Sequence, residues 1–403
     1  MVVSAVILAF VLLIFTIGKS PLFRVDRAGA AIIGAMAVIA SGTLSFDQAS
    51  AAVDHRTIVI LFSMMILVAN LSLAGFFEQT GQLLLRIAGT QTQLLLAVTM
   101  ASGLLSAFCI NDVVCLLFTP VVLSICKKTG AEPLPYLLAT AMSSNIGSAA
   151  TLLGNPQNIL IASLSKLSFL DYLTTALPFS LLGLSLVYGL LRIRYRAMLA
   201  LPLQVPATSD ASICHPYLIK KALAVLIMIL TGYALGGDLA VLSGAGGAFL
   251  LVTRRVKPNK IYAGIDFNLL IMFIGLFVVV AGVEKSGLLQ AFTGRLTSDC
   301  LESPVFFSLL TVLLSNIVSN VPAVLLLNYF IPSPDGALWW KALALLSTFA
   351  GNLTITGSIA NLIVAEIAAK EGVRVGFRDY FLIGFPLTLL LCLGVTYWFH
   401  LIV

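Results

Sequence analysis

Long apolar stretches dominate the chain, and short polar segments separate them. About 20 apolar residues suffice to cross a bilayer as a helix. Runs close to that length occupy Val2–Gly18, Ala28–Leu44, Thr57–Gly75, Thr174–Leu191, Ala222–Leu235, Ile261–Val283 and Tyr380–Val403. No basic residue precedes the first run and no small-residue cleavage site follows it, so we expect a membrane span there rather than a signal peptide. The pattern predicts an all-α polytopic membrane protein.

Small and polar residues interrupt the apolar pattern at four places: Cys109–Asp112, Ser143–Asn158, Ser315–Pro322 and Gly351–Asn361. One such motif alone could serve only to pack helices together. Irregular backbone at membrane depth is tolerated only where protein buries it or where it lines a wet cavity. We therefore expect re-entrant hairpins at about 93–126 and 303–331, and broken helices at about 133–168 and 341–369.

Broken helices leave free N–H groups that attract anions and polar oxygens, and free carbonyls that can hold a cation or a proton donor. Asn, Ser and Thr side chains supply further donors and acceptors without a fixed charge. The predicted substrate-binding residues are Asn111, Asn145, Gly147, Ser148, Thr151, Gly154, Asn155, Asn158, Ser319, Asn320, Asn352, Thr354, Thr356, Gly357, Ser358 and Asn361.

Asp112 is the acidic residue that the pattern places inside the membrane. An intramembrane carboxylate is costly, so it indicates a function by default. We expect Asp112 to carry the coupling proton. The alternative is a hairpin-tip acid that caps a half-helix.

Composition narrows the function class. The 403 residues are 60% hydrophobic and 10% charged, whereas soluble domains carry roughly 25% charged residues. This excludes a soluble enzyme, and the net charge of +6 gives no reason to expect a nucleic-acid partner. Motifs of metalloproteases, serine hydrolases and nucleotide-binding loops do not occur, and we expect no cofactor, no metal site and no enzymatic activity.

Positive charges suggest the topology, because cytoplasmic loops are enriched in Lys and Arg. A re-entrant first hairpin places 18 of the 23 Lys and Arg residues inside, and leaves Arg56, Lys166, Lys285, Arg295 and Lys341 outside. This predicts about ten crossings, with both termini outside.

The two halves of the chain match each other. Phe169-Leu170-Asp171-Tyr172 aligns with Phe377-Arg378-Asp379-Tyr380 at an offset of 208 residues. Further matched pairs are Asn111 with Asn320, Thr151 with Thr354, Gly154 with Gly357, and Asn158 with Asn361. We predict a first repeat over 1–196, a cytoplasmic linker over 197–219 and a second repeat over 220–403. Five crossings per repeat make the second copy inverted, which is typical of secondary transporters with a site at the midplane.

The Ser-Asn-Ile-Gly and Gly-Asn-Pro-Gln-Asn segments, the hairpin tips and Asn-Leu-Thr-Ile-Thr-Gly-Ser-Ile-Ala-Asn resemble the ion transporter superfamily over nearly the whole chain. That group includes the arsenical pump membrane subunits, the citrate and P-protein-like permeases, and the divalent anion–sodium symporters. The resemblance implies scaffold and transport domains and an elevator-like movement of the site. It is compatible with a homodimer and with a soluble ATPase partner.

Hairpin tips differ within this superfamily. The sodium–dicarboxylate branch carries Ser-Asn-Thr at both tips, whereas this chain has Ile110-Asn111-Asp112 and Ser319-Asn320-Val321. An Asn-Asp tip is more similar to the arsenical pumps, while Gly154-Asn155-Pro156-Gln157-Asn158 is similar to anion permeases.

We therefore expect an ion-coupled secondary transporter of a small anion or metalloid in a bacterial inner membrane. The leading interpretation is efflux of arsenite or antimonite in exchange for protons. The sequence leaves open a citrate, dicarboxylate or sulfate permease coupled to H⁺ or Na⁺, and a sodium–proton antiporter.

Overall fold

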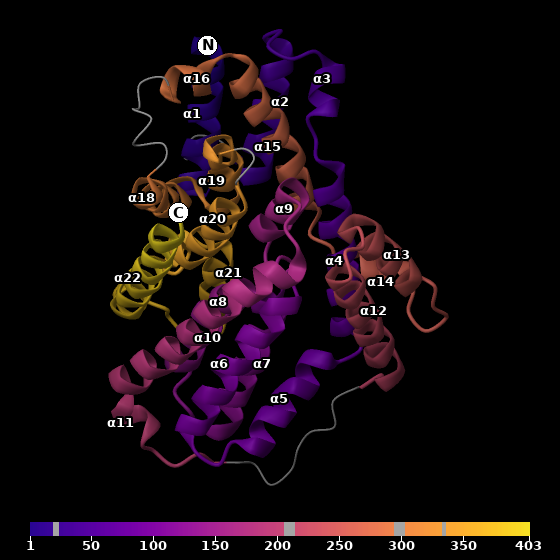
Figure 1. The fold of residues 1–403 in the computed structure, drawn as a ribbon. Coiled ribbons are helices and arrows are strands. Elements are labelled where there is room, and N and C mark those ends of the chain that lie inside the picture. The colour runs from indigo at the N-terminus through magenta and orange to yellow at the C-terminus, as the bar shows by residue number, and fades with distance from the viewer. Residues whose placement is uncertain (19–23, 205–213, 294–302, 333–335) are drawn as a thin grey trace.

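The computed structural model describes residues 1–403 except 19–23, 205–213, 294–302 and 333–335 (Figure 1). All regular elements in these described ranges are helices, which confirms the expected all-α fold. Part of the predicted linker, together with Lys19, Arg295 and Cys300, lies outside the described residues.

The helices of the first half are α1 (Val2–Ile17), α2 (Arg27–Ala40), α3 (Phe46–Ala51), α4 (His55–Leu73), α5 (Phe76–Ile87), α6 (Gln91–Phe108), α7 (Asn111–Thr129), α8 (Leu134–Ser148), α9 (Pro156–Ser165), α10 (Phe169–Arg194) and α11 (Arg196–Leu199). Those of the second half are α12 (Pro216–Ala234), α13 (Leu239–Leu251), α14 (Pro258–Tyr262), α15 (Phe267–Lys285), α16 (Leu288–Thr293), α18 (Pro304–Val318), α19 (Asn320–Leu327), α20 (Ala337–Ala350), α21 (Ile359–Lys370) and α22 (Phe377–Ile402). There are also two short 3₁₀ turns. The first, η1 (Asn328–Phe330), follows α19, and the second, η2 (Ile355–Gly357), precedes α21.

Six helices in the described part are long and apolar enough to cross a membrane: α4, α6, α10, α12, α15 and α22. Five of these correspond to predicted crossings, while α6 is an arm of the first hairpin. Helices α1, α2 and α13 are apolar but shorter, with 16, 14 and 13 residues. The predicted number of ten crossings therefore stays a prediction.

Aspartate side chains start matched helices in the two halves. Asp26 and Asp238 accept hydrogen bonds from backbone N–H groups at the starts of α2 and α13. Asp54 and Asp266 do the same for α4 and α15. Such caps satisfy N–H groups that have no partner within the helix. The two aspartates of each pair are 212 residues apart in the sequence. Corresponding helices of the two halves therefore begin with the same kind of cap.

The two segments predicted as hairpins each form a pair of consecutive helices that contact each other. The chain turns at Cys109 and Ile110 between α6 and α7, and at Ser319 between α18 and α19. The first pair lies in the lower half of Figure 1 and the second in the upper half. The arms α6 and α7 have 18 and 19 residues, which is long for the arms of a hairpin that does not cross the membrane.

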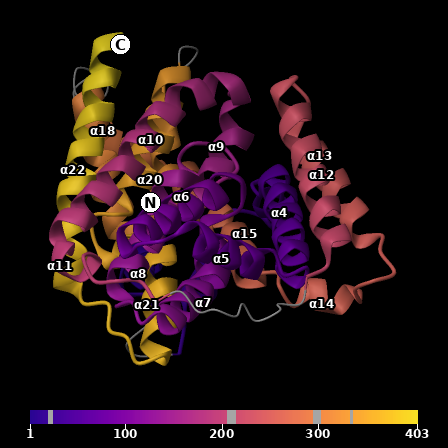
Figure 2. The same cartoon turned by 90° about the horizontal axis from the view of Figure 1, so that it is seen from below.

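Helices of each half pack against helices of the other half, in matching pairs. Helix α15 packs against α1 and α2, and α4 packs against α12 and α13. In the same way α7 packs against α21, and α19 against α9. Figure 2 shows α12 and α13 along one side of the molecule, next to α4. Each hairpin therefore rests on the second half of the other broken helix.

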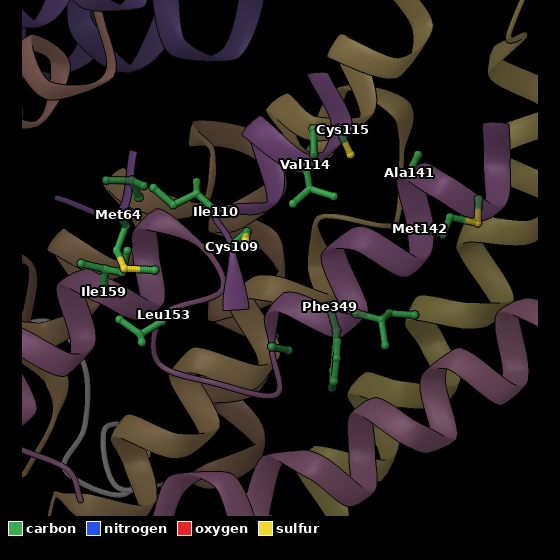
Figure 3. Packing of buried hydrophobic residues seen from close by; sticks show 14 of the residues in the cluster. Met64, Cys109, Ile110, Val114, Cys115, Ala141, Met142, Leu153, Ile159 and Phe349 are labelled. Atoms are coloured by element: carbon green, nitrogen blue, oxygen red, sulfur yellow. The ribbon is translucent and has the colours of Figure 1, made fainter. Parts of the chain in front are cut away.

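The first hairpin tip is held in an apolar environment. Cys109 and Ile110 lie among buried side chains that include Met64, Val114 and Ile159 (Figure 3). Each of these five side chains is at most 3% exposed. Tight packing of this kind is worth about 25 cal/mol for each Å² of apolar surface removed from water, so the tip has a defined position.

Candidate functional site

The starts of four helices meet around one narrow cavity. Helices α7, α9, α19 and α21 each contribute residues from their first turn. The lining residues are Phe15, Asn111, Asp112, Pro156, Gln157, Leu269, Met272, Ser319, Asn320, Val321, Pro322, Ser358 and Ile359. The cavity leaves ≈ 20 Å³ for the centres of water-sized molecules, and one bound water needs about 10–15 Å³ by this measure. In this conformation it has room for about one or two water molecules or a bare ion, so a larger solute needs a wider conformation.

The four helix starts give the cavity a positive partial charge. Helix N-termini carry unpaired N–H groups and about half a positive charge each. Helices α7, α19 and α21 have no side-chain cap from their own N-cap residue. Among the described lining residues there is no Lys or Arg. Backbone dipoles rather than side-chain cations therefore favour oxygen atoms here.

Asp112 is the ionisable residue in the described lining of this cavity. Its carboxylate lies near the backbone N–H of Ala360, at the start of α21. Arg27, at the start of α2, attracts this carboxylate, while Asp266 repels it. Asp112, on the first hairpin, therefore faces the start of a helix in the other half of the chain.

Two asparagines from the two hairpin tips present carbonyl oxygens at the cavity. Asn111 is 3% and Asn320 is 8% exposed. Within the part of the chain that the structure describes, neither Oδ1 atom has a hydrogen-bond partner. A buried acceptor without a partner is costly and calls for an explanation such as a bound ion or solute. Both oxygens are suited to accept a hydrogen bond from a solute or to bind a cation.

Asn145, at the end of α8, connects both halves behind the cavity. Its Oδ1 accepts hydrogen bonds from Asn111 Nδ2 at 3.0 Å and from Ser358 Oγ at 3.0 Å. Its Nδ2 donates to Asn352 Oδ1 at 2.9 Å and to Asn361 Oδ1 at 3.0 Å. The Asn145 side chain is thus fully used by protein partners, and it does not line the cavity.

The breaks in the two helices are held by the same contacts. Asn158 Nδ2 donates to the Ser148 and Thr151 carbonyls at 3.4 and 2.9 Å. Residues 203 positions later repeat this, because Asn361 Nδ2 donates to the Gly351 and Thr354 carbonyls at 2.8 and 3.3 Å. These bonds satisfy carbonyls that the end of each first half-helix leaves free.

The predicted site residues fall into three groups. Those that line the cavity are Asn111, Asp112, Ser319, Asn320 and Ser358. Those that form the buried hydrogen-bond network around it are Asn145, Ser148, Thr151, Asn155, Asn158, Asn352 and Asn361. Those whose side chains neither line the cavity nor join this network are Gly147, Gly154, Thr354, Thr356 and Gly357, although the Gly154 carbonyl accepts from the Asn111 N–H and the Thr354 carbonyl accepts from Asn361 Nδ2.

The glycines of the third group allow close approach of the backbone. A Cβ at Gly147 would lie 2.0 Å from the Gly103 carbonyl oxygen, and one at Gly154 would lie 2.3 Å from the Ser148 oxygen. A Cβ at Gly357 would meet Asn316 Oδ1 at 2.9 Å. These three positions therefore leave little room for a side chain. The Thr354 and Thr356 hydroxyls contact each other at 3.2 Å.

Sequence reasoning missed two kinds of site residue. Phe15 of α1 and Leu269 and Met272 of α15 close the cavity from the side of the long apolar helices, and no polar signal marks them. Tyr172 and Tyr380 are buried in the network, where they donate to the Ala149 carbonyl at 2.7 Å and to Asn352 Oδ1 at 3.2 Å. The aligned Asp-Tyr pairs of the repeat were a signal for these tyrosines.

Known proteins resemble the chain along most of its length. It is 26% identical to a Dictyostelium discoideum protein named as the transporter arsB, with 92% of this chain and 86% of that protein covered. It is 28% identical to the silicon efflux transporter LSI3 of Oryza sativa subsp. japonica, with 92% and 91% covered. The crystal structure of the Alcanivorax borkumensis YdaH transporter has the same fold, with a TM-score of 0.57, 16% identity and coverage of 99% and 97%.

The sequence profile of the citrate transporter family matches residues 10–350. The matched range includes both hairpins, the first broken helix and the first part of the second broken helix. The relatives of this chain are transporters rather than enzymes. The chain is therefore a multi-pass membrane transporter that belongs to the citrate transporter family.

Proposed function

We propose that this transporter exports a small metalloid hydroxide, arsenite or antimonite, in exchange for protons. The observation that carries the proposal is the combination of groups at the cavity. Backbone N–H groups at helix starts donate hydrogen bonds, while Asn111, Asn320 and Asp112 offer acceptors. A hydroxyl group donates and accepts at once, so it suits both. Arsenite at neutral pH is mostly an uncharged trihydroxide, which needs no Lys or Arg.

Asp112 is the proposed proton carrier. Its ionised carboxylate accepts a charge-assisted hydrogen bond from a solute hydroxyl, which is roughly twice as strong as a neutral one. A protonated Asp112 places a donor where the solute also needs to donate. Proton and solute therefore exclude each other at this residue, which is the requirement for exchange.

An elevator-like movement is part of the proposal. Helices α1, α2, α4, α12, α13 and α15, which pack in exchanged pairs, would form the scaffold. The hairpins, the broken helices, α10 and α22 would form the transport domain that carries the cavity. The contacts that recur at an offset of 203 residues support an internal repeat in that domain.

Citrate or another carboxylate is a second candidate, and the family description favours it. The helix starts would bind the carboxylate oxygens. Competition separates the two candidates, because millimolar citrate or succinate would inhibit flux of a carboxylate substrate and would leave arsenite exchange unaffected.

The test uses purified protein in liposomes with an internal pH dye and arsenite in the outer solution. We expect arsenite to move protons in the opposite direction, and we expect Asp112→Asn to abolish this exchange. Glu366→Gln is the control, because Glu366 lies on α21 but is exposed and away from the cavity. Full proton-driven exchange by Asp112→Asn would rule out its role. Sodium-dependent carboxylate flux without arsenite exchange would overturn the substrate.

A further inference from the structure

The asparagines around the cavity have amide orientations that backbone carbonyls determine. A carbonyl oxygen only accepts, so the atom facing it must be the amide nitrogen. Asn361 Nδ2 faces the Gly351 carbonyl at 2.8 Å, and Asn352 Nδ2 faces the Met142 carbonyl at 3.2 Å. The oxygens of Asn361 and Asn352 must therefore point the other way.

Both of these oxygens point at Asn145. The atom of Asn145 between them must be a donor, namely Nδ2, at 2.9 and 3.0 Å. This leaves Asn145 Oδ1 on the side of the first hairpin. Only an amide nitrogen of Asn111 can then face it, and Asn111 Nδ2 does so at 3.0 Å. Each orientation in this chain of amides follows from the one before.

The last member of the chain of amides ends at the cavity. Because its nitrogen is bound to Asn145, Asn111 has only Oδ1 left for the cavity that it lines. Among described residues that oxygen has no partner, and Asn111 is 3% exposed. Rotating the amide would put two oxygens against each other at Asn145. The site therefore presents an acceptor at this point and cannot present a donor.

We propose that Asn145 is a positioning residue that makes the site select solutes carrying a hydroxyl hydrogen over oxyanions that lack one. The inference rests on the proposed function only in taking this cavity as the solute site. Hydrogenphosphate and sulfate are both tetrahedral oxyanions, and the first carries a hydroxyl whereas the second carries none. Sulfate would leave the buried Asn111 oxygen unpaired and facing a negative oxygen, and sites built to bind a hydroxyl reject analogues without it.

Calorimetric titration of the purified protein with phosphate, sulfate and arsenite tests this selection. For the unaltered protein we expect phosphate to bind at least about tenfold more tightly than sulfate, the factor typical of one unpaired buried acceptor. In Asn145→Ala the Asn111 amide can rotate and offer its nitrogen, so the ratio should fall severalfold, to the selection that the acceptors of Asp112 and Asn320 still provide. Asn111→Ala removes the acceptor without touching the bonds from Asn145 to Asn352 and Asn361, and should have the same effect if Asn145→Ala fails to fold.

Thr119→Val is the matched control, because it removes a buried hydrogen bond on α7, to the Cys115 carbonyl, away from the cavity and from the amide chain. Its phosphate-to-sulfate ratio should equal that of the unaltered protein. Equal affinities in the unaltered protein, or an unchanged ratio in Asn145→Ala and Asn111→Ala, would overturn the inference. A ratio that depends on Asn145 together with no proton-coupled arsenite flux would uphold it and refute the proposed function instead.

Discussion

Ser319, at the tip of the second hairpin, has a backbone conformation that only glycine adopts readily. Its φ is 76° and its ψ is 159°, and non-glycine residues in this region carry about 1–3 kcal/mol of strain. The only other described non-glycine residue with positive φ is Lys166. Replacing Ser319 by glycine removes the strain, while the greater freedom of glycine in the unfolded chain costs about 0.5–1 kcal/mol. We expect Ser319→Gly to stabilise the protein by up to about 2 kcal/mol.

Ser358 provides the comparison for this prediction. It precedes α21 as Ser319 precedes α19, and it lines the same cavity, but its φ of −141° is ordinary extended backbone. Ser358→Gly carries the glycine cost and loses the bond to Asn145, worth about 0.5–1.5 kcal/mol. Equilibrium unfolding in mixed micelles should therefore move in opposite directions for the two variants. Equal destabilisation by both would show that Ser319 is not strained.

Two further predictions concern buried groups. Asp171→Ala should destabilise the protein by about 1–3 kcal/mol, because it leaves the buried ammonium of Lys341 without its carboxylate. Lys341→Met removes the buried charge itself and should change stability by less than about 1 kcal/mol. Equal losses of stability in thermal unfolding of the two variants would contradict this asymmetry. Gly147→Ala should cost at least about 2 kcal/mol, because its methyl group would overlap the Gly103 carbonyl. Gly189→Ala is the control, because its added methyl group would meet no atom within 4 Å, and it should be neutral or stabilising by up to about 1 kcal/mol. A folded and fully stable Gly147→Ala would refute the close packing at Gly147.

The polar parts of the site could be predicted from sequence, and the apolar parts could not. Asn155 followed by Pro156 is a helix-start signal, and α9 does begin there with an Asn155 cap. Phe15 and Met272 gave no signal, because an apolar residue on a membrane helix looks the same whether it faces lipid or a cavity.

Geometry decides the remaining features of the site. Asn145 was expected to bind solute, but its four hydrogen bonds go to other protein groups. Amide orientation depends on contacts between residues more than 200 positions apart, such as Asn145 and Asn352, so composition and spacing carry no trace of it. The length of the hairpin arms likewise depends on tertiary packing rather than on where the polar tip falls.

The exchange of partners between the two halves has a consequence for biosynthesis. Helix α7 rests on α21, which the ribosome makes about 240 residues later, and at about 5–20 residues per second this takes roughly 12–50 s. During that time the polar tip around Asn111 and Asp112 has none of its partners from the second half. The contacts between the two halves can therefore form only after the second half has been made.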